Sequence, residues 1–293
     1  MKPASFDLIA ALLHTISGLV IGPDKLYLLE TRLAPIMKAH KIASLDALAD
    51  TIRAARPGGI TPAIMNTPSP LEVAVIEAMT TNESFFFRDE KPFAHVRTHV
   101  LPRLLSTRPA GAKLRIWSAA ASTGQEAYSL AMILAEQKSS LGHRSFEILG
   151  TDIAREQLSR AGDGLYTQFE VQRGLPMQYL VKYFKKDGTS WRINDTIRSM
   201  VQFKLFNLLS DLRSLGQFDI VFCRNVLIYF DQPTKARVLA AIAKQMPADG
   251  VLYLGGAETV LGITDAFTSA PGERGVYERT PTAAARQFAA VGR

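Results

Sequence analysis

The sequence predicts an α/β protein in which a small all-helical domain precedes a doubly wound, mostly parallel β-sheet. After residue 113, short apolar runs alternate with helix-like segments, the pattern of parallel strands joined by helices. The first run, residues 114–117, leads into a turn of small residues that ends at Gly124. The next run ends at Thr151 and Asp152, and the 28 residues from Gly124 to Asp152 (152 − 124) accommodate one helix and one strand.

The turn and Asp152 predict a binding site for a nucleoside-containing ligand on a Rossmann-like sheet. Small residues let the backbone approach a ligand closely, and the first amides of the following helix can face it. A carboxylate at the end of the second strand can accept hydrogen bonds from both hydroxyls of a ribose. Ala119 and Ala121 occupy the first two glycine positions of a G-x-G-x-x-G motif and only Gly124 matches, which disfavours an ordinary NAD enzyme.

Composition and charge limit the class of protein. The 293 residues can bury a good core in one large or two unequal domains. The net charge of +7 permits an acidic partner, but the chain has no lysine/arginine block of the kind that nucleic-acid arms carry. No apolar run reaches the roughly 18 residues of a membrane span. Cys223, the single cysteine, excludes an internal disulfide and fits a reducing cytoplasm, and the five scattered histidines suggest no metal site.

Residues 1–79 form the predicted helical domain of about four helices. Apolar residues recur at helical spacing in two segments, at positions 6, 9, 13 and 16 and at positions 26, 29, 33 and 36. Ser44 is the expected N-cap of a third helix, which runs to about residue 55, before a Pro-Gly-Gly break. Ser69 and Glu72 have capping-box spacing around Pro70, so a fourth helix is expected from Pro70 to about Thr80.

Residues 80–293 carry the predicted sheet. We expect strands at residues 114–118, 146–151, 218–223, 251–254 and 275–277. We expect helices at residues 92–105, 124–137, 154–161, 175–184 and 232–246. Residues 185–206 differ, because a turn at 185–188 and short strands at 191–193 and 201–205 predict a small antiparallel β insert.

Three strand ends are expected to meet at the carboxyl edge of the sheet, where ligands bind in doubly wound folds. They are residues 118–124, Asp152, and the pair Arg224-Asn225. Two alternatives stay open. Asp152 could cap the helix that starts near residue 154, and Asn225 could be a helix cap or turn residue. A capping role and a ligand-binding role can coexist in one side chain.

Residues 85–88, Phe-Phe-Phe-Arg, precede the sheet and have two interpretations. Three adjacent aromatic residues favour burial in a core over stacking on a ligand. Arg88 suits a carboxylate or phosphate, since its guanidinium is a planar fork, and a solvated surface arginine is the alternative. Cys223 lies in a predicted buried strand without a nearby histidine, which indicates a structural residue.

Six ordered blocks of the sequence resemble the chemotaxis receptor methyltransferases of the CheR type. They are residues 80–88 (TTNESFFFR), 117–124, 150–153 (GTDI), 164–166 (GLY), 206–209 (FNLL) and 218–230, which contains CRNVLIYF. A weaker match in the helical N-terminus includes Lys25 and Arg32. The resemblance implies a Rossmann-like methyltransferase that uses S-adenosyl-L-methionine to methylate glutamate side chains on chemoreceptor helices and releases S-adenosyl-L-homocysteine. Such an enzyme is a protein-glutamate O-methyltransferase.

The resemblance also implies a cofactor site. Its positions are Asn82, Ser84, Arg88, Ala119, Gly124, Glu126, Asp152, Asn207, Leu208, Asn225 and Val226. Asn82, Ser84 and Arg88 are expected at the methionine end of the cofactor. Glu126 is expected near its amino group and Asp152 near its ribose.

The other family positions lie on the adenine side and at the substrate. Asn207 and Leu208 are expected to line the adenine side. Asn225, Val226 and Tyr229 are expected at the cofactor and the target carboxylate. Arg88 and Tyr229 are the candidate catalytic residues: Arg88 would hold the methionine carboxylate and Tyr229 would orient the incoming glutamate.

The sequence departs from the family pattern at several positions. Ala120 stands where many members have glycine, Gln125 where glutamate is usual, and Ala127 where proline is usual. Residues 255–258, Gly-Gly-Ala-Glu, stand where Gly-His-Ser/Ala-Glu is common. The segment 185–193 is shorter than the loop of members that grip a C-terminal receptor peptide, so this chain is expected not to need that tether.

The implied partner is the cytoplasmic helical domain of chemoreceptors, bound by a monomeric, cytoplasmic enzyme without nucleic-acid binding or membrane insertion. Basic residues of the helical domain are docking candidates, or else form a solvated helix face: Lys25, Arg32, Lys38, Arg53 and Arg56. Two rival functions stay open, a methyltransferase for another protein or a small molecule, and a catalytically impaired signalling adaptor that binds the cofactor. The departures at Gln125, Ala127 and Gly256 are the only support for the adaptor.

Overall fold

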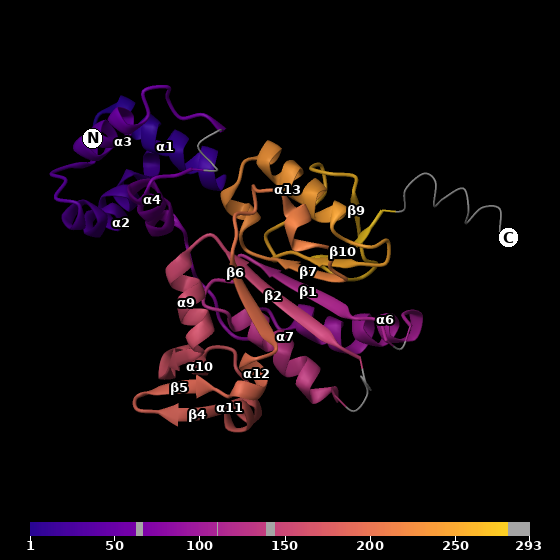
Figure 1. The fold of residues 1–293 in the computed structure, drawn as a ribbon. Coiled ribbons are helices and arrows are strands. Elements are labelled where there is room, and N and C mark those ends of the chain that lie inside the picture. Colours follow the sequence, from indigo (N-terminus) through magenta and orange to yellow (C-terminus); the bar gives the residue numbers. More distant parts are fainter. Residues whose placement is uncertain (63–66, 110, 139–143, 281–293) are drawn as a thin grey trace. The chain divides into compact units, whose positions relative to one another are not determined.

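The computed structural model describes residues 1–62, 67–109, 111–138 and 144–280, and the chain divides into two compact units (Figure 1). The first unit comprises Met1–Thr81 together with Tyr229–Thr234, and the second comprises Asn82–Ile228 and Lys235–Arg293. The division after Thr81 lies close to the predicted boundary at residue 79. The return of Tyr229–Thr234 to the first unit is not predicted by the sequence.

The first unit is built from four α-helices and one short 3-10 helix among its described residues. They are α1 (Pro3–Ser17), η1 (Pro23–Lys25), α2 (Leu26–Ala39), α3 (Leu45–Ala55) and α4 (Pro70–Met79). The predicted caps are confirmed. The Ser44 side chain accepts a hydrogen bond from the amide of Ala47, and Ser69 and Glu72 form a complete capping box at the start of α4. Apolar residues of all four helices, such as Leu12, form the core.

The second unit contains a seven-stranded sheet in the order β6-β2-β1-β7-β8-β10-β9. The strands are β1 (Leu114–Ala119), β2 (Phe146–Asp152), β6 (Val201–Leu205), β7 (Ile220–Cys223), β8 (Val251–Tyr253), β9 (Phe267–Ser269) and β10 (Val276–Arg279). The first five in spatial order pair in parallel, and β10 is antiparallel to both β8 and β9. The predicted doubly wound, mostly parallel sheet is therefore confirmed, and β9 is an addition.

Helices connect these strands as the alternating pattern predicts. They are α5 (Lys91–His95), η3 (Val96–Val100, a π-helical turn), α6 (Leu101–Thr107), α7 (Gln125–Glu136), α9 (Arg155–Asp163), α12 (Asp195–Arg198), η4 (Leu212–Leu215), η5 (Leu227–Tyr229) and α13 (Gln232–Lys244). Helix α7 packs against β1, β2 and β6, and α9 packs against β2 and β6. Among the described residues, none of the helices has both the length and the apolar character needed to cross a bilayer.

A small antiparallel sheet exists, but its predicted extent is wrong. It consists of β3 (Leu165–Thr167), β5 (Ser190–Ile193) and β4 (Phe184–Asp187), with α10 (Gln168–Gln172) and α11 (Met177–Tyr183) between β3 and β4. Strand β6, predicted to belong to it, pairs in parallel with β2 at the edge of the main sheet. The alternating sequence of β6, V-Q-F-K-L, suits either location, because both expose one face.

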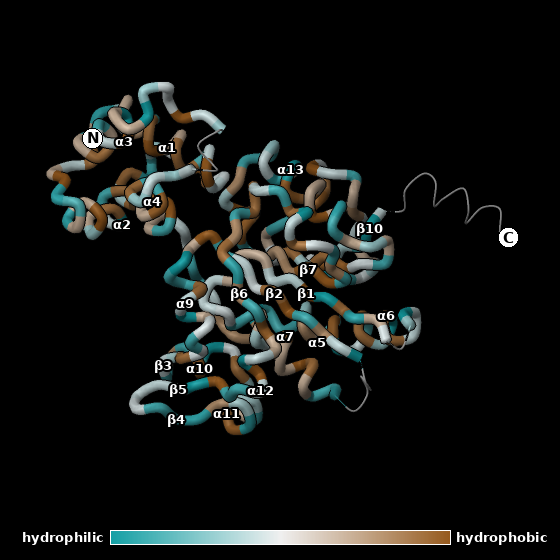
Figure 2. Tube along the Cα trace, viewed as in Figure 1, coloured by the Kyte–Doolittle hydropathy of each residue, from teal (hydrophilic) through white to brown (hydrophobic). Residues whose placement is uncertain are grey.

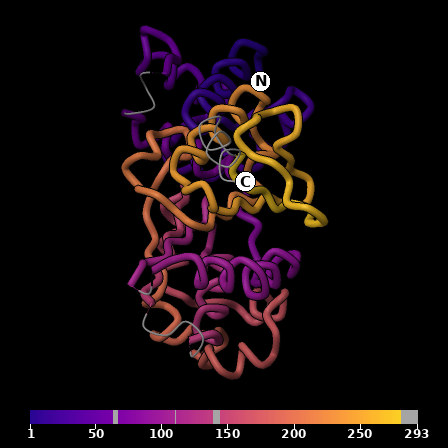
Figure 3. The backbone as a smooth tube through the Cα atoms, turned by 90° about the vertical axis from the view of Figure 1, so that its right-hand side faces the viewer, coloured from indigo at the N-terminus to yellow at the C-terminus, as the bar shows by residue number. Residues whose placement is uncertain are grey.

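The two sheets of the second unit differ in polarity. Figure 2 shows β4 and β5 as largely hydrophilic, whereas β7 is hydrophobic and buried along its whole length. Figures 1 and 3 both show the small sheet at the end of the second unit away from β8, β9 and β10. The main sheet therefore supplies the strand ends on which a ligand site can be built.

Candidate functional site at the strand ends

The four strands β6, β2, β1 and β7 are neighbours, and their carboxyl ends lie at the same edge of the sheet. Ala119 of β1 is level with Thr151 of β2 and with Cys223 of β7, and Asp152 is level with Leu205 of β6. From β1 the chain adds β2 and then β6 on one side, and after β6 it crosses to β7 and β8 on the other side of β1. The edge between β1 and β7 therefore contains the topological switch point where such sheets bind ligands. The structure thereby brings together the loops that carry Gly124, Asp152, Asn207 and Asn225.

The turn after β1 has an unusual backbone. Ala120, Ser122 and Gly124 have φ angles of 56°, 51° and 91°, in the left-handed region. At Gly124 a β-carbon would lie 2.9 Å from the Phe203 ring and 3.0 Å from the β-carbon of Ala161. Gly124 is therefore required both by its φ angle and by the close packing of the turn.

Asp152 supports this turn and the start of α9. One carboxylate oxygen accepts the amide hydrogen of Ser122 (2.8 Å), and the other accepts that of Ala154 (2.9 Å). This contact closes a turn just before α9 and is not a helix cap, because the N-cap residue of α9 is Ala154 and that helix has no side-chain cap. The capping alternative considered for Asp152 is therefore wrong. Because a carboxylate oxygen can accept two hydrogen bonds, these contacts are compatible with binding a ribose.

Ala120 gives the first testable prediction. A left-handed alanine costs about 1–2 kcal/mol, and replacement by glycine removes this strain. Glycine also raises the conformational entropy of the unfolded chain, which offsets part of the gain in stability. We expect Ala120→Gly to raise the free energy of unfolding by about 0.5–1 kcal/mol, measured by urea denaturation. The control is Ala121→Gly at the neighbouring buried alanine, whose φ is not positive and which should lose stability. Equal effects of the two substitutions would contradict the strain argument.

Residues 82–88, which follow the first unit in the sequence, are hydrogen-bonded to the turn after β1 and to α7. The Ser122 hydroxyl donates to the carbonyl oxygen of Asn82 (2.9 Å), and the amide of Phe87 donates to the Ser129 hydroxyl (3.0 Å). Phe86 is fully buried, which confirms the prediction of core packing for that residue. Its ring meets those of Tyr166 and Phe184 edge to face, with centroids 5.0 and 5.6 Å away.

Arg88 is half-buried, not a fully solvated surface side chain. Its guanidinium lies over the Phe85 ring, 5.2 Å from the centroid, and donates to the carbonyl oxygen of Glu83 (3.1 Å). Arg173 also lies over this ring, at 4.3 Å, and pairs with the Glu83 carboxylate. The two contacts hold Arg88 beside the segment that also contains Asn82 and Ser84.

Arg224, at the end of β7, is a residue whose role the sequence did not assign. Its side chain is 1% exposed. It donates to the Glu126 carboxylate (3.0 Å), to the Asp89 carboxylate (2.6 Å) and to the carbonyl oxygen of Arg88 (2.8 Å). Glu126 in turn accepts from the Ser118 hydroxyl (2.8 Å). The buried guanidinium thus connects the end of β7 to α7 and to the Arg88 segment. Its charge is compensated by the two carboxylates with which it pairs.

Glu258 is the second residue that sequence reasoning missed. Its buried carboxylate accepts four backbone amides: those of Asn225 (2.8 Å) and Gly255 (2.6 Å) on one oxygen, and those of Val226 (3.0 Å) and Ile228 (3.2 Å) on the other. Glu258 therefore fixes the loop after β7. The sequence contained one indication, since Glu258 is the residue at which the block 255–258 still matches the family pattern Gly-His-Ser/Ala-Glu.

The remaining predicted residues lie in turns. Asn225 has a φ of 59° and packs against Gly255, where a β-carbon would lie 2.7 Å from the Asn225 side-chain nitrogen. The turn alternative for Asn225 is thereby confirmed. Asn207 accepts the amide of Leu209 (3.0 Å) in the loop after β6, next to Leu208. Tyr229 belongs to the first unit, so the second unit does not assemble it with the other predicted residues.

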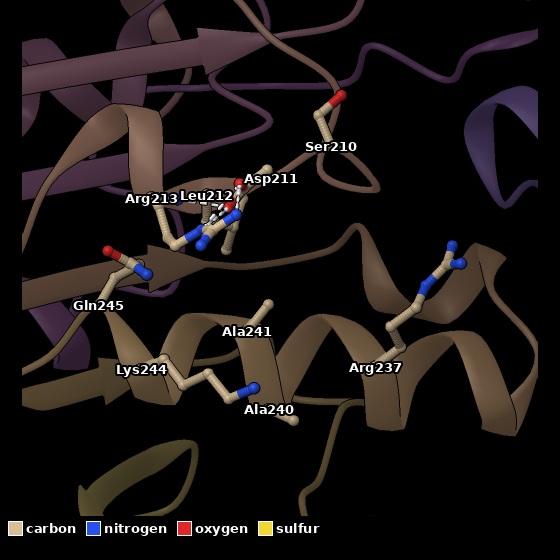
Figure 4. A pocket seen from close by; sticks show the side chains of 9 residues that line it. All are labelled: Ser210, Asp211, Leu212, Arg213, Arg237, Ala240, Ala241, Lys244 and Gln245. Carbon is tan, nitrogen blue, oxygen red and sulfur yellow. Dashed lines mark hydrogen bonds and ion pairs between the residues drawn. The ribbon is translucent and has the colours of Figure 1, made fainter. Parts of the chain in front are cut away.

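The second unit also contains the single cysteine and a groove lined partly by basic residues. Cys223 is fully buried, and burial raises the pKa of its thiol well above the ordinary range, consistent with a structural role. Among the described residues, no three His, Cys, Asp or Glu side chains are placed to hold a metal ion. A groove of about 390 Å³ beside α13 contains Arg213, which pairs with Asp211, and the separate cations Arg237 and Lys244 (Figure 4). These basic groups do not converge on one point.

The donor set at the strand ends suits a nucleoside with a charged tail. A turn of small residues lies beside a carboxylate that can accept hydroxyl hydrogens, and this combination is typical of adenosine-containing cofactors. Arg88 offers a guanidinium for a carboxylate group, and Glu126 offers a carboxylate for an amino group.

Sequence comparisons agree with this geometry. The family described as "CheR methyltransferase, SAM binding domain" matches residues 82–276, and "CheR methyltransferase, all-alpha domain" matches residues 4–59. The chain is 38% identical over 266 residues to chemotaxis protein methyltransferase Cher2 of Pseudomonas putida, covering 89% of this chain and 92% of that protein. It is 38% identical over 280 residues to chemotaxis protein methyltransferase 1 of Pseudomonas aeruginosa, covering 94% and 97%. It is 36% identical over 254 residues to chemotaxis protein methyltransferase 1 of Vibrio cholerae, covering 85% and 87%.

Proposed function

The chain belongs to the CheR methyltransferase family, and on this premise we propose that it methylates glutamate side chains of chemoreceptors. S-adenosylmethionine is the cofactor of the family domain that covers residues 82–276. The observation that supports the proposal is that the loops after β1, β2, β6 and β7, which carry Gly124, Asp152, Asn207 and Asn225, lie at one edge of the sheet.

The chemistry needs no general base. A glutamate carboxylate has an ordinary pKa of about 4.3, so the substrate is already ionised at neutral pH. When bound, the cofactor supplies a methyl group on a positively charged sulfur, and the carboxylate oxygen attacks that methyl in line. Charge disappears in this step, so a pocket that excludes water favours it, and orientation of the two reactants contributes much of the rate.

These requirements assign roles to the candidate residues. A cation that pairs tightly with the attacking carboxylate would stabilise the reactants and slow the attack. We therefore assign Arg88 to the cofactor's methionine carboxylate and Tyr229 to the orientation of the incoming glutamate. We assign Asp152 to accept hydrogen bonds from the ribose hydroxyls, and Glu126 to a position near the cofactor's amino group. Asn207 and Leu208 line the adenine side.

The departures from the family pattern are accommodated by the structure, which supports an active enzyme over an adaptor. Gln125 is buried, and its side-chain oxygen accepts from the Thr123 hydroxyl (2.7 Å), so it supports the turn. Ala127 is fully buried in α7. Gly256 is exposed in the loop held by Glu258. None of the three opens the turn or removes a proposed ligand-binding group.

Receptor docking through the helical unit rests on fewer cations than the sequence suggests. Arg32 donates to the carbonyl oxygens of Met79 (2.9 Å) and Thr80 (3.1 Å) at the end of α4. Arg53 pairs with Asp50 on α3.

Arg56 is also engaged internally, because it pairs with the buried Glu72 and holds the pKa of that carboxyl below its usual range. Lys25 and Lys38 are exposed. We assign them to contact with an acidic face of the receptor's cytoplasmic helical domain, and we propose that the enzyme acts as a cytoplasmic monomer without a C-terminal peptide tether.

Arg88 gives a sharp test of the cofactor site. We expect Arg88→Ala to weaken binding of S-adenosylhomocysteine by about tenfold or more in calorimetric titration, since a charge-assisted hydrogen bond contributes about 1.5–3 kcal/mol. The matched control is Arg173→Ala, which removes the other guanidinium over Phe85 and should leave the affinity nearly unchanged. Asp152→Ala is a poorer test, because it also removes the supports of the Ser122 and Ala154 amides.

The experiment for the function is a methyl-transfer assay with labelled S-adenosylmethionine and a cytoplasmic fragment of a chemoreceptor. We expect label on the fragment that alkali releases as methanol, which is diagnostic of a carboxyl methyl ester. Transfer to another protein or small molecule without transfer to receptors would support the first rival function. Cofactor binding without transfer to any acceptor would support the adaptor.

A further inference from the structure

Tyr229 lies where the chain passes from the second unit into the helical unit. The last residue before this point, Ile228, donates its amide to Glu258 in the second unit (3.2 Å). Immediately after it, the carbonyl oxygen of Tyr229 accepts the amide of Val20 in the first unit (2.9 Å). Leu19 and Phe230 then form an antiparallel bridge. The backbone on each side of the proposed substrate-orienting residue is thus anchored.

Gly18, at the end of α1, packs closely against the same segment. Its φ is 77°, and a β-carbon there would lie 3.1 Å from the Thr234 methyl group and 3.2 Å from the Phe230 ring. Phe230 and Thr234 are both buried. A side chain at residue 18 would therefore be strained by the φ angle and would crowd Phe230 and Thr234, so glycine allows the end of α1 to pack closely against this segment.

A side-chain pair reinforces this attachment. His14, in the last turn of α1, contacts the Asp231 carboxylate through its Nε2 (2.9 Å). The other Asp231 oxygen accepts the amide of Thr234 (2.9 Å). The Thr234 side-chain hydrogen bond is the main cause that holds the pKa of Asp231 below its usual range, so Asp231 is a carboxylate at neutral pH.

From these contacts we propose that the end of α1, with His14, Gly18 and Val20, is a positioning device for Tyr229. The helical unit then holds in place the residue that we assign to orient the glutamate. The inference rests on the proposed function, since it requires Tyr229 to act on the substrate carboxylate. His14, Gly18 and Asp231 are positioning residues, because they act through Tyr229.

The test is a kinetic cycle with the full chain, a receptor fragment and S-adenosylmethionine. We expect Gly18→Ala to lower kcat by about tenfold, because small misplacements of orienting groups have large kinetic effects, with the KM for S-adenosylmethionine unchanged. In a Tyr229→Phe background the same substitution should lower kcat little further, because the tyrosine hydroxyl that it would misplace is already absent. An equal fold-loss in both backgrounds, or no loss in either, would overturn the proposal.

A milder variant covers the case in which Gly18→Ala folds poorly. His14→Ala should lower kcat by up to about fivefold, the size expected of a partly exposed pair. His14→Gln, which keeps a donor for Asp231, should restore most of that loss, and His40→Ala at an exposed histidine of the same unit should have none. Failure of the glutamine to restore kcat would count against the proposal. Absence of receptor methylation by the wild-type chain would instead refute the proposed function.

Discussion

Replacing Glu258 by alanine should destabilise the protein strongly and abolish cofactor binding. The substitution leaves the amides of Asn225, Gly255, Val226 and Ile228 without their shared acceptor in a buried loop. Hydrogen bonds to a charged group contribute about 1.5–3 kcal/mol each, and solvent can reach some of the freed amides, so we expect a loss of about 4 kcal/mol. Urea denaturation gives the free energy of unfolding, and calorimetry with S-adenosylhomocysteine gives the affinity.

Glu278→Ala is the matched control for this prediction, because Glu278 is an exposed glutamate on β10, next to the strand that leads into the Glu258 loop. It should change stability by less than about 0.5 kcal/mol. The free energy of unfolding of Glu258→Gln should lie between those of Glu258→Ala and the wild type. The glutamine keeps one acceptor oxygen but directs its N–H groups at two backbone donors. Wild-type stability and affinity in Glu258→Ala would mean that the loop after β7 has another anchor.

Local sequence patterns predicted much of the fold because their causes are local. The N-cap at Ser44 and the capping box at Ser69 and Glu72 involve residues three positions apart, and both are present. The strand-turn-helix pattern from residue 114 to Gly124 also depends on neighbours, and it correctly located the edge of the sheet that carries the candidate site.

Features that the sequence missed depend on contacts between distant residues. The alternating pattern of β6 fits an insert strand and an edge strand equally, and only its pairing with β2 distinguishes the two. Arg224 meets Glu126 across 98 residues and Asp89 across 135, and no local pattern encodes those pairs. The attachment of Tyr229–Thr234 to the helical unit is likewise a long-range contact, through Leu19 and His14.

The second large effect is expected from Arg224→Met. This substitution leaves the carboxylates of Glu126 and Asp89 and the carbonyl oxygen of Arg88 without their common donor. Removing one partner of a buried ion pair costs about 3–5 kcal/mol when the remaining charge stays uncompensated. Here that charge is Glu126, whose side chain is 14% exposed, whereas Asp89 is 55% exposed and its charge is screened by solvent. The segment with Asn82, Ser84 and Arg88 would also lose its anchor on β7. We therefore expect a loss of stability together with a loss of S-adenosylhomocysteine affinity beyond tenfold.

Two further variants separate charge from geometry at Arg224. Arg224→Lys keeps the positive charge, but one ammonium cannot reproduce the forked contacts to Glu126 and Asp89, so it should recover only part of the affinity. Arg213→Met is the control, because Arg213 is 83% exposed and pairs only with the neighbouring Asp211 among the described residues, so its loss should change stability little. If Arg224→Lys matched the wild-type affinity, the charge alone would suffice. If Arg224→Met matched it, the Arg88 segment must be held by the Asn82 and Phe87 backbone contacts, and Arg224 would be a structural residue of β7 without influence on the cofactor.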